Sequence, residues 1–171
     1  MKLLGAVLIL LACSGLGIMA GERIAARPRQ LQKLRNDLLL LEMDINYAAT
    51  PLPEALSKLV QTSDRPVRQL WEGTLNYLVS GEGLTAEEAW HRSLTGFSSQ
   101  SALQEKDLAV LRDFGAGLGT TNRREQLKKF KLVQEQLAVL AAQAEETRQK
   151  TERIYRTMGV LTGIALIILL F

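Results

Sequence analysis

The chain has 171 residues, a single cysteine, a single histidine and a formal net charge of +3. This length is typical of one domain, and the lone histidine and cysteine argue against a histidine-based metal cluster, a Ser/His/Asp triad and an intrachain disulfide. Aromatic residues make up only 5% of the chain and do not alternate with Lys or Arg, which argues against nucleic-acid binding.

Residues 1–22 predict a transmembrane helix. The 19 residues from Leu3 to Gly21 carry no charge, and as a helix they reach about 28 Å, close to a hydrocarbon core of about 30 Å. A cleaved signal peptide and a lipoprotein signal ending at Cys13 are the alternatives. Apolar and small residues continue past Cys13 to Ala20, which favours an uncleaved helix.

Residues 23–156 predict a helical domain, because helix caps and apolar residues recur at helical spacing. Pro28 is expected to break the chain after the first span. A first helix then carries one apolar seam with alternating steps of three and four residues: Leu31, Leu34, Leu38, Leu41, Ile45 and Ala48.

A second and a third helix are expected to follow. Thr50 and Pro51 can start the second helix, and Ser63 or Asp64 can cap the third. The expected buried residues of these two helices are Leu52, Ala55, Leu56, Leu59, Val67, Leu70, Trp71, Leu75 and Leu78.

Three more helices complete the domain. Residues 85–88 form a capping box for the fourth, residues 96–99 are expected to be a loop, and residues 101–104 cap the fifth. Asn122 is expected to cap the sixth helix, which continues without a break into the second apolar run. The expected buried residues are Ala89, Trp90, Leu94, Leu103, Leu108, Leu111, Phe114, Leu127, Phe130, Val133, Leu137, Leu140 and Ala144.

Residues 157–171 predict a second transmembrane helix. They carry no charge and reach about 22 Å as a helix. This run crosses a bilayer if Arg153 and Arg156 extend back to the headgroups, and a buried core helix is the alternative. The predicted fold is therefore all-α, a six-helix antiparallel bundle flanked by N- and C-terminal transmembrane helices.

Nine of the 21 basic residues lie beside the two apolar runs. Both groups lie on the domain side of the spans, so the positive-inside rule predicts a cytoplasmic domain with both termini across the membrane. Lysine and arginine at such positions favour anionic lipid. The candidate membrane-surface contacts are Arg23, Arg27, Arg29, Lys33, Arg148, Lys150, Arg153 and Arg156.

A second basic cluster lies near the start of the sixth helix. It is either a solvated helix face or a surface for an acidic partner or lipid. Its members, the candidate partner surface, are Arg123, Arg124, Lys128, Lys129 and Lys131.

Five glycines are candidate helix-turn residues: Gly81, Gly83, Gly115, Gly117 and Gly119. The last three suggest a phosphate loop at first sight, but no strand precedes them and no Gly-Lys-Ser/Thr follows. We expect left-handed glycines at a helix end that also permit close helix packing. Glu87 and Glu88 are interpreted as first-turn acids of a helix and not as an acid–base pair. No metal, cofactor or catalytic residue is predicted.

Residues 49–56, 80–90 and 114–119 resemble helix starts and the glycine turn of the F-type inner-membrane platform proteins of type II secretion and type IV pili. That resemblance implies a six-helix cytoplasmic bundle. The platforms carry two copies of the domain, whereas this chain has one, so a platform-like assembly would require a homo-oligomer.

Across its whole length the chain resembles the stage III sporulation protein AB family. The resemblance is carried by the two-span layout and by residues 2–8, 27–31, 47–52 and 111–115. It implies a secretion-like complex linking mother cell and forespore, a place in the mother-cell membrane around the forespore, and a cytoplasmic ATPase and other membrane proteins as partners.

We therefore expect a non-enzymatic scaffold or adaptor that couples the ATPase to a membrane channel. A membrane-anchored helical signalling or sensor protein is the alternative. A membrane enzyme is disfavoured because the two apolar runs contain no charged side chain.

Overall fold

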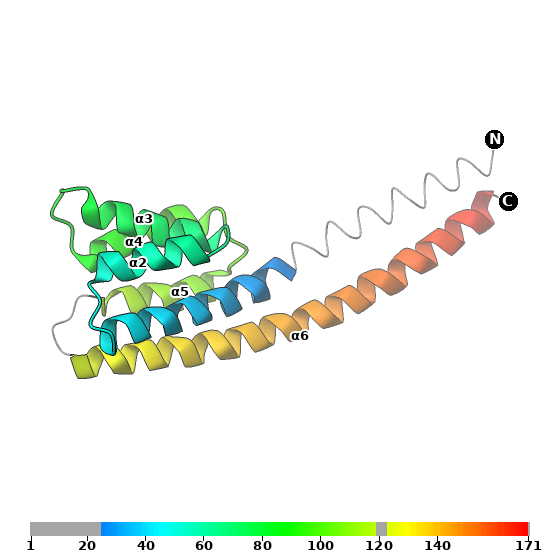
Figure 1. Cartoon of the computed structure of the whole chain (residues 1–171). Coiled ribbons are helices and arrows are strands. Elements are labelled where there is room, and N and C mark those ends of the chain that lie inside the picture. The colour runs from blue at the N-terminus through cyan, green and yellow to red at the C-terminus, as the bar shows by residue number, and fades with distance from the viewer. Residues whose placement is uncertain (1–24, 119–122, 171) are drawn as a thin grey trace. The chain divides into compact units, whose positions relative to one another are not determined.

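The computed structural model of the chain describes the backbone of residues 25–118 and 123–170, and the side chains of residues 25–118 and 124–151. All regular secondary structure in these ranges is helical, which confirms the all-α class. Six helices are present there (Figure 1): a first helix over residues 25–46, α2 Leu52–Thr62, α3 Val67–Val79, α4 Ala86–Ser98, α5 Glu105–Gly115 and α6 Arg123–Leu170.

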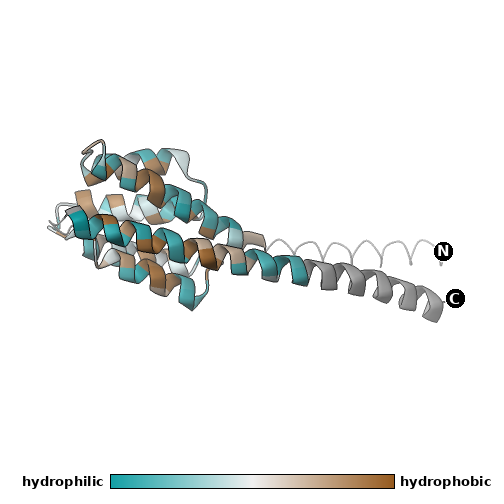
Figure 2. Cartoon of the chain, turned by 90° about the horizontal axis from the view of Figure 1, so that it is seen from below, coloured by the Kyte–Doolittle hydropathy of each residue, from teal (hydrophilic) through white to brown (hydrophobic). Residues whose placement is uncertain are grey.

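Residues Arg27–Ala142 form one compact unit, called the bundle below, and the chain from Gln143 onward belongs to a second unit. Hydrophobic and hydrophilic residues alternate along the helices of the bundle (Figure 2), as expected for amphipathic helices around a shared core.

The first helix lines the core with the predicted seam. Leu31, Leu34, Leu38 and Leu41 are at most 1% exposed. The expected break at Pro28 is wrong, because residues 25–46 form an uninterrupted helix in which Pro28 is buried. The seam ends earlier than expected, since the helix stops at residue 46 and leaves Ala48 exposed.

The expected caps of α2 and α3 are wrong. The N-cap of α2 is Pro51 and that of α3 is Pro66, and neither makes a side-chain capping bond. Ser63 cannot serve as a cap because its hydroxyl is buried and donates instead to Asp37. In α3 the buried positions include Thr74.

The predicted capping box of α4 is confirmed. The Glu88 N–H donates to Thr85 Oγ1 at 3.2 Å, and the Thr85 N–H donates to Glu88 Oε2 at 2.8 Å. The Thr85 N–H, and after it the Thr85 hydroxyl, which donates to Glu88 Oε2 at 2.9 Å, lower the pKa of Glu88 below its usual 4.5 by stabilising its carboxylate. The expected loop at residues 96–99 is wrong, because α4 continues to Ser98 and places Phe97 in the core at 2% exposure.

The fifth and sixth helices follow the predictions more closely. The N-cap of α5 is Gln104, the last residue of the expected capping run, and not Ser101 at its start. Helix α6 is continuous over 48 residues, as expected. Its described buried residues are Phe130, Val133, Leu137, Ala141 and Ala144. The predicted cap Asn122 lies outside the described residues.

Four aromatic rings join the last four helices through the core. The ring centroids of Trp71 and Trp90 are 5.5 Å apart, those of Trp90 and Phe114 5.4 Å, and those of Phe114 and Phe130 5.1 Å. Trp90 also donates its indole N–H to the Leu111 carbonyl at 2.7 Å. Because tilted and edge-to-face ring pairs add to the free energy of apolar burial, this column fixes α3, α4, α5 and α6 against one another.

In the part of the chain that the structure describes, no helix combines the length and the apolar character that a membrane crossing requires. The predicted span at residues 1–22 lies outside the described residues. Residues 157–170 of the predicted second span continue α6 as a helix, and their side chains lie outside the described residues.

Candidate functional site

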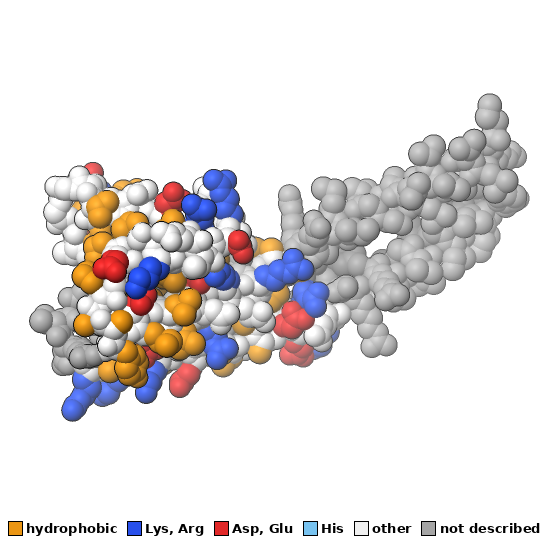
Figure 3. Space-filling model, in the orientation of Figure 1, with side chains coloured by type: hydrophobic (Ala, Val, Ile, Leu, Met, Phe, Trp, Pro, Cys, Tyr) orange, Lys and Arg blue, Asp and Glu red, His pale blue; other side chains and the backbone are white. Residues whose placement is uncertain are grey.

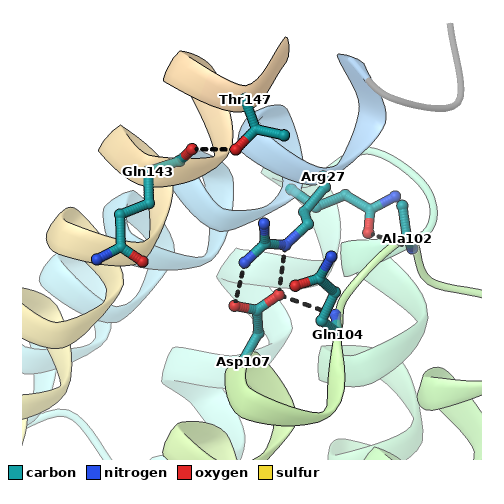
Figure 4. A network of polar contacts seen from close by, with 7 residues as sticks. Arg27, Ala102, Gln104, Asp107, Gln143 and Thr147 are labelled. Atoms are coloured by element: carbon teal, nitrogen blue, oxygen red, sulfur yellow. Dashed lines mark hydrogen bonds and ion pairs between the residues drawn. The ribbon is translucent and has the colours of Figure 1, made fainter. Parts of the chain in front are cut away.

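The N-terminal part of the described helix over residues 25–46 is tied to α5 by a buried ion pair. Arg27 donates from Nε and Nη2 to the two carboxylate oxygens of Asp107, at 2.7 and 2.8 Å. The Gln104 N–H donates to the same carboxylate at 2.8 Å (Figure 4). One turn later, the Gln30 side chain accepts from the Ala102 N–H at 2.8 Å. These contacts hold the first helix against the start of α5 and the connection before it.

The middle of the first helix is tied to α3 by a second buried carboxylate. Asp37 Oδ2 accepts from Ser63 Oγ at 2.7 Å and from the indole N–H of Trp71 at 2.8 Å. Its Oδ1 lies 2.8 Å from the Lys33 ammonium, an ion-pair contact without hydrogen-bond geometry. Lys33 also donates to the Thr62 carbonyl at 3.2 Å. The Asp37 side chain therefore connects the first helix both with the C-terminal end of α2 and with α3.

The end of the first helix lies beside α6. The buried Glu42 accepts from the Gln134 side-chain amide at 2.7 Å. The side-chain amide of Asn46 is buried, and neither of its polar atoms has a hydrogen-bond partner among the described residues. The carboxylates of Asp37 and Asp107 both accept hydrogen bonds from other elements of the bundle, so they position the first helix.

The structure separates the candidate membrane-surface residues into two groups. Arg27 and Lys33 are engaged by Asp107 and Asp37, whereas Arg29 is exposed. Arg23 lies outside the described residues, and so do the side chains of Arg153 and Arg156.

Arg148 and Lys150 lie on α6 in the second unit. Arg148 pairs with Glu145 at 2.8 Å and Lys150 with Glu146 at 2.7 Å. The hydrogen bond and charge of Lys150 lower the pKa of Glu146 below its usual 4.5. Both basic residues therefore have an acidic neighbour on their own helix.

Most of the candidate partner surface is solvent-exposed. Arg124, Lys128 and Lys131 are exposed, whereas Lys129 is half-buried, and the side chain of Arg123 lies outside the described residues. Figure 3 shows Lys and Arg side chains next to hydrophobic ones at the end of the bundle where α6 begins.

The candidate glycines serve two different purposes. Gly81 and Gly83, between α3 and α4, have φ values of 79° and 70°, which glycine adopts without steric cost. The expected left-handed conformation is wrong at Gly115 and Gly117, whose φ angles are not positive. A Cβ at Gly115 would overlap the indole ring of Trp90, so this position serves close packing, whereas one at Gly117 would meet the flexible side chain of Lys129. Gly119 lies outside the described residues.

Sequence reasoning missed both buried carboxylates. The sequence carries a signal for Asp37, because it lies next to Leu38 on the core-facing side of the first helix. A charged residue on that side is expected to be buried and to have a partner. Asp107 follows the cap residue Gln104 by three positions, the spacing of a carboxylate that accepts from a cap N–H. Its partner Arg27 is 80 residues away, and no local pattern predicts that pairing.

No group of three or more His, Cys, Asp or Glu side chains within the described ranges is arranged to hold a metal ion. His91 lies 3.9 Å from Glu87, and both side chains are exposed on α4.

Comparison with known proteins assigns the chain. The family model of stage III sporulation protein AB matches residues 2–171. Stage III sporulation protein AB of Bacillus subtilis (strain 168) is 35% identical over 170 residues, which are 99% of each chain. A solved structure of stage III sporulation protein AB has a TM-score of 0.70 and 33% identity, and the match covers 73% of this chain and 98% of that one. The chain therefore belongs to the stage III sporulation protein AB family.

Proposed function

We propose that the protein is a non-enzymatic membrane scaffold of the secretion-like complex that links mother cell and forespore. Its helical bundle lies in the mother-cell cytoplasm between two spans, residues 1–22 and 157–171, and couples a cytoplasmic ATPase to the membrane channel. The observation that carries the proposal is the family match over residues 2–171, which includes both apolar runs as well as the bundle.

The helix pattern supports attachment at both ends. Helix α6 leaves the bundle and continues to Leu170 without interruption, so the backbone of residues 157–170 is helical, as a span requires. The first helix is held by Arg27 to the core of the bundle. A bundle whose first and last helices lead to the two apolar runs is suited to keeping one surface close to a membrane.

Co-purification with the ATPase tests this function. The full chain, extracted in mild detergent from sporulating cells, is expected to retain the ATPase of the same complex. A matched chain in which residues 27–142 are replaced by an unrelated helical bundle between the same two apolar runs is expected to lose it. Equal recovery with both chains, or no recovery with either, would overturn the proposal.

A membrane-anchored sensor is the second candidate, because the 48-residue α6 connects the bundle to the second apolar run. A sensor requires α6 to change its packing with a stimulus. Disulfide formation between cysteines at Glu42 and Gln134, whose side chains are in contact, would then differ between vegetative and sporulating cells. A scaffold is expected to give the same crosslinking yield in both.

A further inference from the structure

Three basic side chains form a row on the outer face of α6, which we call the basic row. Arg124, Lys128 and Lys131 are exposed and are separated by four and three residues, so they lie on one side of the helix. Val133 and Leu137 are buried on its other side, against the core. Figure 3 shows Lys and Arg side chains at the end of the bundle where α6 begins.

The basic row carries positive charge that the described residues do not neutralise. Neither Lys128 nor Lys131 forms an ion pair within the described ranges, although the exposed Glu135 lies one turn after Lys131. Further along the same helix, by contrast, Lys150 pairs with Glu146 at 2.7 Å. Like charges three or four residues apart on a helix repel each other. The row therefore costs helix stability, and the fold supplies no compensating contact for the two lysines.

Membrane lipid lies out of reach of the basic row on the proposed function, on which this inference rests. Helix α6 is continuous to Leu170. At 1.5 Å per residue, Lys128 and Lys131 lie about 43 and 39 Å along it from residue 157, where the second span begins. Attraction between exposed charges is screened over about 8–10 Å at physiological salt. Anionic headgroups therefore do not attract the row.

Nucleic acid and a second copy of the chain fit the basic row less well than an acidic protein. Phe130 lies between the two lysines in sequence but is fully buried, so it offers no ring on which a base can stack. Symmetric pairing of two copies through this face would bring two basic rows together, and like charges oppose that contact.

We propose that the basic row is the docking site for an acidic surface of a partner protein, with Asp or Glu side chains that face Lys128 and Lys131. Within the proposed function, that partner is the cytoplasmic ATPase. Opposite charges on the two surfaces speed the encounter of the proteins and fix the orientation in which they meet.

Charge reversal in the full chain tests the site, with the recovery of the ATPase in the co-purification described above as the readout. Lys128→Glu is expected to lower this recovery about fivefold. Glu135→Lys, which extends the row by one turn, is expected to raise it about threefold. The control, Lys106→Glu on α5, changes an exposed charge outside the row and is expected to leave the recovery unchanged. Raising the salt from about 0.1 to about 0.5 M is expected to lower the recovery with wild type.

A loss of binding in Lys128→Glu is distinguishable from a loss of structure. The new carboxylate lies four residues after Arg124 and three before Lys131, where opposite charges attract. The midpoint of thermal unfolding, measured by circular dichroism of the full chain in detergent, is therefore expected not to fall. A lower midpoint together with a lower recovery would give Lys128 a structural role and would overturn the docking site.

Four outcomes with a wild-type chain that retains the ATPase would overturn the docking site and leave the proposed function standing. They are an unchanged recovery with Lys128→Glu, an unchanged or lower recovery with Glu135→Lys, an equal loss with Lys106→Glu, and a loss of recovery on nuclease treatment.

A wild-type chain that does not retain the ATPase overturns the proposed function, and a photocrosslink then decides on the basic row separately. Benzoylphenylalanine replaces Leu132, which is 55% exposed beside Lys131, in the full chain in sporulating cells. A product with an acidic segment of another protein, reduced by Lys128→Glu, supports the docking site. No protein product, or a product with lipid or with a second copy of the chain, overturns it.

Discussion

The guanidinium of Arg27 and the carboxylate of Asp107 form a two-bond ion pair across 80 residues of sequence. The Asp107 side chain is fully buried and that of Arg27 is 11% exposed. This pair sets the position at which the first helix enters the bundle. Because a buried charge without its partner is costly, the pair also makes that position specific.

Replacing Arg27 is expected to destabilise the bundle strongly. Arg27→Ala leaves the Asp107 carboxylate buried without its counter-charge, and we expect the free energy of unfolding to fall by about 3 kcal/mol. Urea denaturation of residues 25–142, followed by circular dichroism, measures this change. The control is Arg29→Ala, an exposed arginine two positions away, with an expected loss below about 0.5 kcal/mol. Similar losses for the two variants would contradict the role of the pair.

Two aspartates on the first helix are expected to differ in their contribution to stability. Asp37→Ala removes the acceptor of two buried donors, Ser63 and Trp71, and is expected to cost about 3 kcal/mol, with a shift in Trp71 fluorescence. Asp44→Ala removes an exposed ion pair with Lys58 and is expected to cost less than about 1 kcal/mol. The same denaturation experiment compares the two variants. If Asp44→Ala lowers the free energy of unfolding as much as Asp37→Ala does, the buried hydrogen bonds of Asp37 do not have the role assigned to them.

Two glycine-to-alanine substitutions are expected to have opposite signs. Gly115→Ala places a methyl group against the Trp90 ring and is expected to destabilise by about 1–3 kcal/mol. Gly96→Ala adds a methyl group in open space on the exposed side of α4 and is expected to stabilise by about 1 kcal/mol, because alanine favours helix over glycine. Thermal denaturation of the two variants measures both effects. A stabilised Gly115→Ala variant would show that the contact with Trp90 is not close.

The capping box of α4 is expected to show a defined pH dependence. Thr85→Ala is expected to cost about 1 kcal/mol at neutral pH. The pKa of Glu88 is lower in the folded state than its usual 4.5, so its contribution is complete above that value and disappears as the pH falls through the folded-state pKa. Wild type and Glu88→Gln are therefore expected to differ in stability at pH 7 and to converge as the pH falls below the folded-state pKa of Glu88.

Glu87→Gln is the matched control for this titration, because Glu87 lies in the same helical turn and forms no hydrogen bond to Thr85 within the described residues. Its difference in stability from wild type at pH 7 is expected to be smaller than that of Glu88→Gln. If the difference in stability between wild type and Glu88→Gln does not change with pH, the hydrogen bonds assigned to the Glu88 carboxylate are contradicted.

The sequence predicted the features of this fold that local patterns control. The leucine seam of the first helix, the capping box at Thr85 and the unbroken last helix all follow from spacing along one segment. The wrong boundaries have tertiary causes: α4 continues past Gly96 because Phe97 packs in the core, and Ser63 does not cap α3 because Asp37 takes its hydroxyl. Pro28 is tolerated in the helix, which the local preference of proline alone did not predict.

The candidate site was harder to predict because it depends on distant contacts. Arg27 and Lys33 are basic and lie close to the first apolar run, so the sequence predicts contact with a membrane surface. Only the fold shows that they pair with Asp107 and Asp37. The exposed hydrophobic residues on the outer side of the first helix were likewise hidden in the sequence. Met43 and Tyr47 can be recognised as exposed only when the opposite side of the helix is known to face the core.

The most direct test of the account is the side of the membrane on which the bundle lies. In a Cys13→Ser chain, single cysteines at the exposed positions Ser80 and Ser99 are treated in intact cells with a membrane-impermeant thiol reagent. Ser63 is unsuitable, because it is 5% exposed and bonded to Asp37. The account predicts no labelling at either position until the cells are permeabilised, and ready labelling of both in intact cells would contradict it.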